Sequence, residues 1–158
     1  VRNMSLILHY RPSTNKLIRL IEGPFINQHD VDIINDSTLI IFNNNTVVDI
    51  PINSKKAHNM KKRIKHAGNF FANIVKYNLK DKSFSTIGDS LFIANKIYTK
   101  NEGLMEFIDP STYFVEEQNQ GLLWVIKNDK VIYKNVFKSQ HKGHHHLPNW
   151  TRIIKHYD

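Results

Sequence analysis

The sequence of 158 residues contains no cysteine, so it can form neither disulfide bonds nor thiolate metal sites. The lack of cysteine leaves the cellular compartment open, because such a chain survives in either redox environment. No uninterrupted apolar run approaches the ~20 residues that a membrane-spanning helix needs, so we expect no membrane span. No signal peptide is visible, but the chain opens on Val1, as a fragment with a missing start would.

One segment lacks acidic residues altogether. Residues 51–80 hold eight Lys and Arg and no Asp or Glu, which leaves fourteen basic and fourteen acidic residues elsewhere and accounts for the net charge of +8. A basic patch can bind nucleic acid. A solvated insertion at about residues 51–70, around "SKKAHNMKKRIKHAG", explains the charge with fewer assumptions. We therefore expect no nucleic-acid partner, and a short helix that begins at Ser54 and ends at Gly68.

Short apolar segments separated by turn residues dominate the rest of the chain. They form four pairs, "LILHY" with "LIRLIEG", "DVDII" with "TLIIFNN", "NIVKYNL" with "SFSTI", and "GLLWVI" with "VIYKNVF". Asn, Asp, Pro and Ser occupy the turns, where their side chains cap the local backbone or preset φ. The pattern predicts an all-β fold built from antiparallel hairpins.

Three of the predicted hairpins resemble one another, because each has a polar turn that ends in a lysine. These are Lys16, Lys82 and Lys130, and the 48 residues between the last two match the period of propeller blades. The segment "LIIF" is apolar on both faces, as expected for a blade covered on both sides. Residues 1–158 are therefore predicted to form one region of about three four-stranded antiparallel blades. Closed propellers have more blades, so either the region belongs to a larger ring or several chains complete one as a homo-oligomer.

Three stretches resemble the arylsulfotransferase-type β-propeller family. "YRPSTNKLIRLIEGPFINQHDVDIINDSTLIIFNN" has the family's Gly-Pro-aromatic step, its Gln-His-Asp and an apolar strand that ends in Asn. "FIDPSTYFVEEQNQGLLWVIKNDKVIYKNVF" is similar to the family's Glu-Glu-Gln-Asn strand and following hairpin. "NWTRII" is close to the family's Trp-Ser-Arg step, with Thr151 in place of Ser. The resemblance implies the C-terminal part of a six-bladed ring.

The resemblance also implies an activity. Characterised members are bacterial enzymes that move sulfate from one phenol to another through a sulfated histidine in a central channel, without a nucleotide donor. The expected substrates are thus an aryl sulfate and a phenol, with no cofactor, and the expected location is periplasmic or extracytoplasmic. Many relatives have no established activity, and a fold does not fix a function. The alternative is a non-catalytic propeller module that binds a ligand or partner.

His29 is the first candidate for chemistry. It precedes a predicted inner strand, where a neutral imidazole could attack sulfur. Asp30 or Asp32 could orient its ring, and Asp30 could also contact substrate. The competing interpretation is that the His-Asp pair is a structural tie between a loop and the next blade.

Arg152 is the second candidate, because a guanidinium presents several donors to a sulfate. It could equally pair with Glu116 or Glu117 within a blade. Those two acids are not a catalytic dyad, since adjacent residues of a strand face opposite sides.

Four histidines lie within residues 141–146. Alternation along a strand would put His144 and His146 on one face, with His141 joining them across Gly143. No further metal ligand can be placed. We therefore predict no metal site, with substrate binding by His144 and His146 or a solvated loop as the alternatives.

Four large aromatic side chains near the end of the chain are predicted to be core residues rather than a cage for a phenol. They are Trp124, Tyr133, Phe137 and Trp150.

Overall fold

The computed structural model describes residues 1–46 and 71–154. Within these ranges the regular structure is mostly β-strand. The ten strands are β1 (Ile7–Arg11), β2 (Lys16–Ile21), β3 (Val31–Asn35), β4 (Thr38–Asn43), β5 (Asn73–Asn78), β6 (Phe84–Ile87), β7 (Leu104–Asp109), β8 (Thr112–Glu117), β9 (Leu122–Lys127) and β10 (Lys130–Val136). The helices are short: η1 (Arg2–Met4), η2 (Pro12–Thr14) and α2 (Asp89–Ala94).

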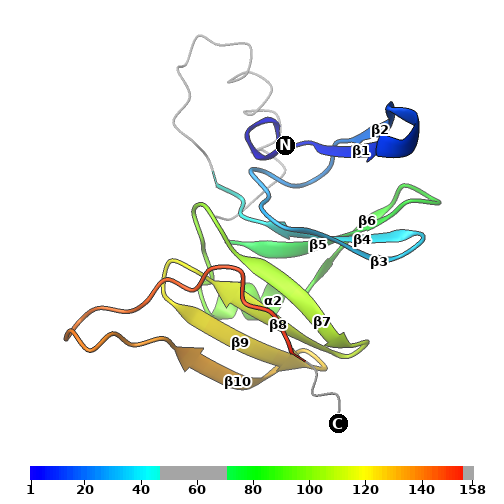
Figure 1. Ribbon diagram of the computed structural model, residues 1–158. Helices are drawn as coiled ribbons and strands as arrows, with labels where there is room; N and C mark the ends of the chain where they lie inside the picture. The colour runs from blue at the N-terminus through cyan, green and yellow to red at the C-terminus, as the bar shows by residue number, and fades with distance from the viewer. Residues whose placement is uncertain (47–70, 155–158) are drawn as a thin grey trace.

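The described strands form three antiparallel sheets that follow one another along the chain (Figure 1). The hairpin β1–β2 stands alone, and two four-stranded sheets have the orders β3-β4-β5-β6 and β10-β9-β8-β7. Each four-stranded sheet pairs its strands in chain order, because short turns connect strands that are neighbours in sequence. The edge strands are β3 and β6 in one four-stranded sheet and β7 and β10 in the other.

Strand β4 explains why the segment "LIIF" has no polar face. Its residues alternate between two cores, since successive strand side chains point to opposite faces. Leu39 and Ile41 pack with the hairpin β1–β2 through Ile7 and Ile21. The alternate residues of β4 pack on the other side, in a core shared with β7, β8, β9 and α2, which includes Ile40, Phe42, Met105, Val115, Trp124 and Phe92. Strand β4 is thus covered on both faces, whereas the edge strand β3 is mostly exposed.

The all-β, antiparallel prediction is confirmed, and so are the four predicted hairpins. Lys16 and Lys130 open the second strands of their hairpins, and Lys82 lies in the turn before β6. The described residues hold two complete four-stranded sheets and one hairpin, rather than three complete blades. The predicted equivalence of the turn lysines would make β1–β2 the counterpart of β5–β6 and β9–β10, the last two strands of the two four-stranded sheets. A ring of blades stays a prediction.

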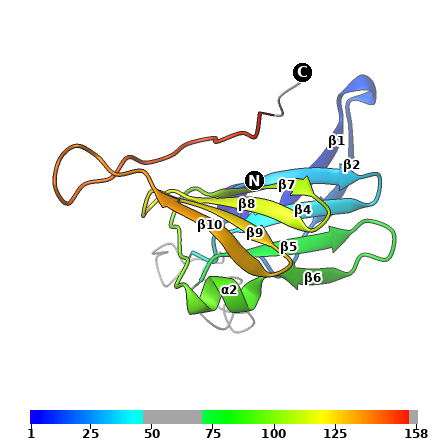
Figure 2. The same ribbon diagram turned by 90° about the horizontal axis from the view of Figure 1, so that it is seen from below.

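The helix α2 and strand β7 were not predicted, whereas strand β8, which pairs with both β7 and β9, contains the Glu-Glu of the strand that the family resemblance implied. Figure 2 shows α2 below the sheets, where Phe92 reaches the core. The predicted helix from Ser54 to Gly68 lies outside the described residues. Within 1–46 and 71–154, none of the helices has both the length and the apolar character needed to cross a bilayer.

A group of buried polar residues follows directly after the apolar part of β4. We call it the asparagine cluster; its members are Asn43, Asn44, Asn45 and Thr46. Buried amides are stable only where their donors and acceptors are paired. Most of the cluster's polar atoms meet this condition by bonding to the backbone of three separate loops, whereas Asn44 Oδ1 has no hydrogen-bond partner among the described residues.

Each loop leads into a different strand. Asn43 Oδ1 accepts the backbone N–H of Ile26 at 2.8 Å, in the segment before β3. Asn45 Nδ2 donates to the carbonyl of Phe71 at 2.9 Å, just before β5. Asn44 Nδ2 donates at 3.1 Å to two carbonyls of the loop before β7, those of Thr99 and Glu102. The strand therefore ends on asparagines because these side chains fix the starts of three other strands.

We predict that Asn43→Ala lowers the free energy of unfolding by at least about 2 kcal/mol. The change leaves the buried N–H of Ile26 without its acceptor, and an orphaned buried donor costs about 1–3 kcal/mol. It also removes the donor to Asn73. Urea unfolding measures the loss. The matched control is Asn35→Ala in the exposed β3–β4 turn, where Asn35 accepts from Ser37 and the loss should stay below about 1 kcal/mol. Equal losses would contradict the anchoring role of the cluster.

Candidate functional site

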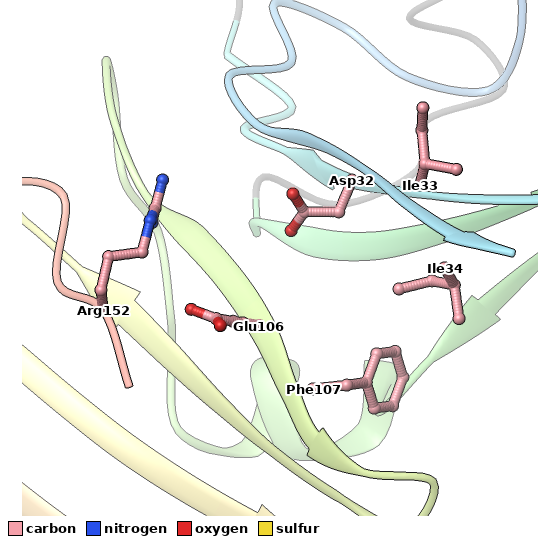
Figure 3. A pocket seen from close by; sticks show the side chains of 6 residues that line it. All are labelled: Asp32, Ile33, Ile34, Glu106, Phe107 and Arg152. Carbon is pink, nitrogen blue, oxygen red and sulfur yellow. The ribbon is translucent and has the colours of Figure 1, made fainter. Parts of the chain in front are cut away.

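The candidate site lies between the edge strands β3 and β7, where the C-terminal segment passes beside them (Figure 3). A cavity of about 390 Å³ opens there. It is lined by Asp32, Ile33, Ile34, Glu106, Phe107 and Arg152. In Figure 3 the carboxylates of Asp32 and Glu106 and the guanidinium of Arg152 approach the same gap from three segments. The combination of apolar walls with a few charged groups is typical of small-molecule sites.

His29 lies at the start of the β3 edge and is half-buried. Its backbone N–H donates to the carbonyl of Phe42 at 3.0 Å, which extends the β3–β4 ladder. Its ring Nδ1 lies 3.2 Å from the carbonyl oxygen of Gly103. A carbonyl oxygen only accepts hydrogen bonds, so Nδ1 carries a proton, and in the neutral form of the ring Nε2 keeps its lone pair. The predicted orienting carboxylate is thus replaced by a backbone carbonyl.

Gly103 allows this contact because it has no side chain. Its φ is +139°, and a Cβ atom there would lie 2.5 Å from a ring carbon of Phe42. Any side chain would push the start of β7 away from β4. The His29 ring therefore meets the Gly103 carbonyl only as long as the two backbones stay close.

Asp30 makes the second bond between the two edges. Its Oδ2 accepts the backbone N–H of Met105, at 3.4 Å. Burial raises the pKa of Asp30, while this hydrogen bond, the charge of Arg152 and the protonated form of His29 lower it. His29 and Asp30 together join the first sheet to the start of β7, which is the tie that the competing interpretation described.

Asp32 lines the cavity and has a perturbed acidity. Burial, with the nearby charge of Asp30, raises the pKa of Asp32 to about 6, and Arg152 opposes the rise. The charge of Glu106 on β7 raises the pKa of Asp32 further. One Glu106 oxygen, Oε2, is buried without a hydrogen-bond partner in the described residues. The cavity therefore concentrates negative charge around a single guanidinium.

The C-terminal segment brings Arg152 to this place. The buried carboxylate of Glu116 accepts the backbone N–H of Thr151 at 2.8 Å. The Arg152 guanidinium stacks over the Trp150 ring, with its Cζ 5.2 Å from the centroid, within the range of a cation–π contact. The Trp150 ring lies 5.8 Å from that of His29. Arg152 thus reaches the site by a backbone anchor, whereas the sequence had offered Glu116 as a partner of its side chain.

The histidine-rich segment lies apart from the cavity lining. The His145 ring bonds to the carbonyl of Asn119 at 2.8 Å, and the exposed rings of His141 and His144 lie 6.3 Å apart. His146 is also exposed. Over residues 1–46 and 71–154, no three His, Asp or Glu side chains are arranged to hold a metal ion. A substrate role for His144 and His146 stays a prediction.

Glu116 and Glu117 act separately, as their alternation predicted. Glu117 Oε1 and Oε2 each accept a backbone N–H at 2.9 Å, from Asn119 and Gln120. Burial raises the pKa of Glu117, and these bonds oppose the rise. The carboxylate therefore fixes the β8–β9 turn.

Two of the aromatic predictions were wrong. Trp124 is fully buried, but Trp150 is 54% exposed and Tyr133 is 51% exposed. Phe137 is half-buried. Sequence alone gave no signal for Gly103 or Glu106, because their importance comes from contacts across long sequence separations.

Comparison with known families decides the relationship. The family model described as Arylsulfotransferase (ASST) matches residues 1–138. The chain belongs to the arylsulfotransferase family. No curated protein and no solved structure matches it. The match includes His29, Asp30, Asp32 and Glu106, whereas Arg152 and the histidines at 141–146 follow its end. Both edges of the cavity thus lie within the arylsulfotransferase-family region.

We predict that the stability of this arylsulfotransferase-family chain falls as pH rises from about 4 to about 6, in part through Asp32. Its pKa is raised in the folded state, from 3.8 to about 6, so the unfolded chain releases the proton first. The folded state then binds more protons, and the free energy of unfolding decreases with pH until both states are ionised.

Asp32→Asn should remove this contribution. The melting temperature of the variant should exceed that of the wild type at pH 7 by more than at pH 4. The control is Asp36→Asn, which deletes one carboxylate from the exposed turn of the same hairpin. A pH profile identical to that of the wild type would contradict the role of burial at Asp32.

Proposed function

We propose that this chain supplies part of an aryl sulfate sulfotransferase centre, in which His29 carries the sulfo group between two phenols. Membership of the arylsulfotransferase family supports aryl substrates in general. The observation that carries the specific role is the contact between His29 Nδ1 and the Gly103 carbonyl. It directs the ring and leaves the Nε2 lone pair as the nucleophile, as a carboxylate does for other catalytic histidines.

The proposed reaction has two steps. The Nε2 lone pair of His29 attacks the sulfur of an aryl sulfate, the bond between sulfur and the aryl oxygen breaks, and the phenolate leaves and takes up a proton. The hydroxyl oxygen of an acceptor phenol then attacks the same sulfur, and the S–N bond returns its electron pair to the ring. The proton of the acceptor goes to a base, and Asp32 is suited to this because its pKa of about 6 lies near neutrality.

Arg152 neutralises the sulfate in this proposal. It is the cation among three carboxylates at the site, and a guanidinium offers paired donors to sulfate oxygens. Asp32 and Glu106 oppose an anion in the cavity, so binding depends on Arg152 and on the protonated fraction of Asp32. The residues 150–154 would then start a further inner strand, and β1–β2 would be the outer half of another blade of a ring.

The alternative is a non-catalytic module of the same architecture. One observation favours it: His29 and Asp30 both bond to the start of β7, through the Gly103 carbonyl and the Met105 N–H. A histidine kept for this tie needs no chemistry at Nε2. The two proposals make different predictions for a substitution that keeps Nδ1 and removes Nε2.

His29→Asn is that substitution, because the asparagine amide N–H takes the place of Nδ1–H. We expect it to keep the bond to Gly103 and the wild-type melting temperature within about 2 °C, a shift below about 1 kcal/mol, and to abolish sulfate transfer. His29→Ala loses both the bond to Gly103 and the Nε2 nucleophile, so its melting temperature should be lower than that of the wild type. The assay follows 4-nitrophenol release from 4-nitrophenyl sulfate with phenol as acceptor, and mass spectrometry detects a sulfo group on the chain.

The exposed His9 on β1 provides the matched control, since His9→Asn changes a histidine away from the site. A fully active, stable His29→Asn variant would reject the nucleophile and leave only the structural tie. Absence of transfer in the wild type, together with a lower melting temperature for His29→Ala, would favour the non-catalytic module.

A further inference from the structure

Trp150 is an exposed tryptophan held in an unfavourable backbone conformation. Its φ is +62°, in the left-handed region that bulky residues rarely adopt. Such a conformation persists only where the surrounding structure enforces it, and it is concentrated at functional sites. More than half of the side chain, 54%, is nevertheless exposed to solvent. Core packing therefore does not explain why the chain accepts this conformation.

The contact that enforces the conformation is on the next residue. The buried carboxylate of Glu116 holds the backbone N–H of Thr151 at 2.8 Å. This anchor fixes the peptide directly after Trp150 and so fixes the direction in which the indole leaves the chain. The indole is thereby placed beside the ring of His29, at a centroid distance of 5.8 Å and an interplanar angle of 53°.

The surroundings of the indole match the two parts of an aryl sulfate. The guanidinium of Arg152 lies over the ring, 5.2 Å from its centroid, and is itself exposed. An anionic group that meets Arg152 and His29 would thus leave an attached aromatic ring next to the indole. Aromatic rings pack favourably at centroid distances of 4.5–7 Å in stacked or edge-to-face arrangements.

We infer that Trp150 is the aryl platform of this site, the side chain against which the aromatic ring of the substrate packs. The inference rests on the proposed function, because it takes the sulfo group to lie at His29 and Arg152. It assigns recognition of the aromatic ring to a residue beyond the family match, which ends at residue 138. Removing the indole should therefore affect aromatic sulfates and spare sulfates without a ring.

The test compares two ligands, 4-nitrophenyl sulfate and ethyl sulfate, by isothermal titration calorimetry at constant ionic strength. In Trp150→Ala the dissociation constant for 4-nitrophenyl sulfate should rise about three- to tenfold, the range expected for one lost aromatic contact. Binding of ethyl sulfate should not change. Trp150→Phe keeps an aromatic face and should stay closer to the wild type. Arg152→Ala should weaken both ligands.

Tyr133 provides the matched control. It is exposed to nearly the same degree, 51%, but lies on β10, at the edge of the sheet opposite β7. Tyr133→Ala should bind both ligands as the wild type does. Unchanged binding of 4-nitrophenyl sulfate by Trp150→Ala, equal weakening of both ligands by that variant, or no binding of the aryl sulfate by the wild type would each overturn the inference.

The same titrations separate this inference from the proposed function. Trp150-dependent binding of the aryl sulfate without any sulfate transfer would support the platform and reject the catalytic role of His29. Transfer that persists with an unchanged KM for the aryl sulfate in Trp150→Ala would reject the platform and leave the catalytic role intact.

Discussion

The asparagine cluster at the end of β4 is the constraint on which the rest of the described structure depends. Its amides are buried, so every bond they make is worth more than the same bond in water, and every bond they lose leaves an unpaired polar group. They hold the backbone before β3, before β5 and before β7. A single short segment therefore decides where three strands begin, and β3 and β7 are the two edges that form the candidate site.

The position of the cavity follows from this arrangement. Strand β4 is buried on both faces and anchors the hairpin on one side and the second sheet on the other. Strands β3 and β7 are left as edges, where polar side chains replace strand-to-strand hydrogen bonds. The Asp30 carboxylate accepts the N–H of Met105, and the His29 ring donates to the carbonyl of Gly103. The side chains that could do chemistry are thus the same ones that satisfy open backbone groups.

Much of the fold could be predicted from the sequence, because hairpins are local. Alternating or continuous apolar segments and the turn residues between them located eight strands, and the double burial of "LIIF" was correctly inferred from its lack of a polar face. The site was only partly predictable. His29, Asp30 and Arg152 do lie close to one cavity edge, but their contacts with Gly103, Met105 and Trp150 join residues far apart in sequence.

The errors share a physical cause. Trp150 is predicted to lie in the core, yet it is 54% exposed and precedes Thr151, whose backbone N–H bonds to the distant Glu116. The asparagines at the end of β4 read from the sequence as the polar end of a strand, because sequence does not show that a polar residue is buried among loop carbonyls. Neither outcome follows from local propensity. Both depend on one buried side chain that satisfies the backbone of a distant segment.

The structural and the catalytic interpretations of His29 are compatible with each other. An imidazole can act as a nucleophile only if one ring nitrogen is unprotonated and its direction is fixed. The bond from Nδ1 to the Gly103 carbonyl fixes the direction of the ring and assigns the proton of the neutral imidazole to Nδ1, and it exists because Gly103 lets β7 approach Phe42. The tie between the sheets is therefore the requirement for chemistry at Nε2 as well as a contribution to stability. A chain that had lost the chemistry would keep the tie for stability alone, so the intact tie agrees with both proposals and only the fate of Nε2 separates them.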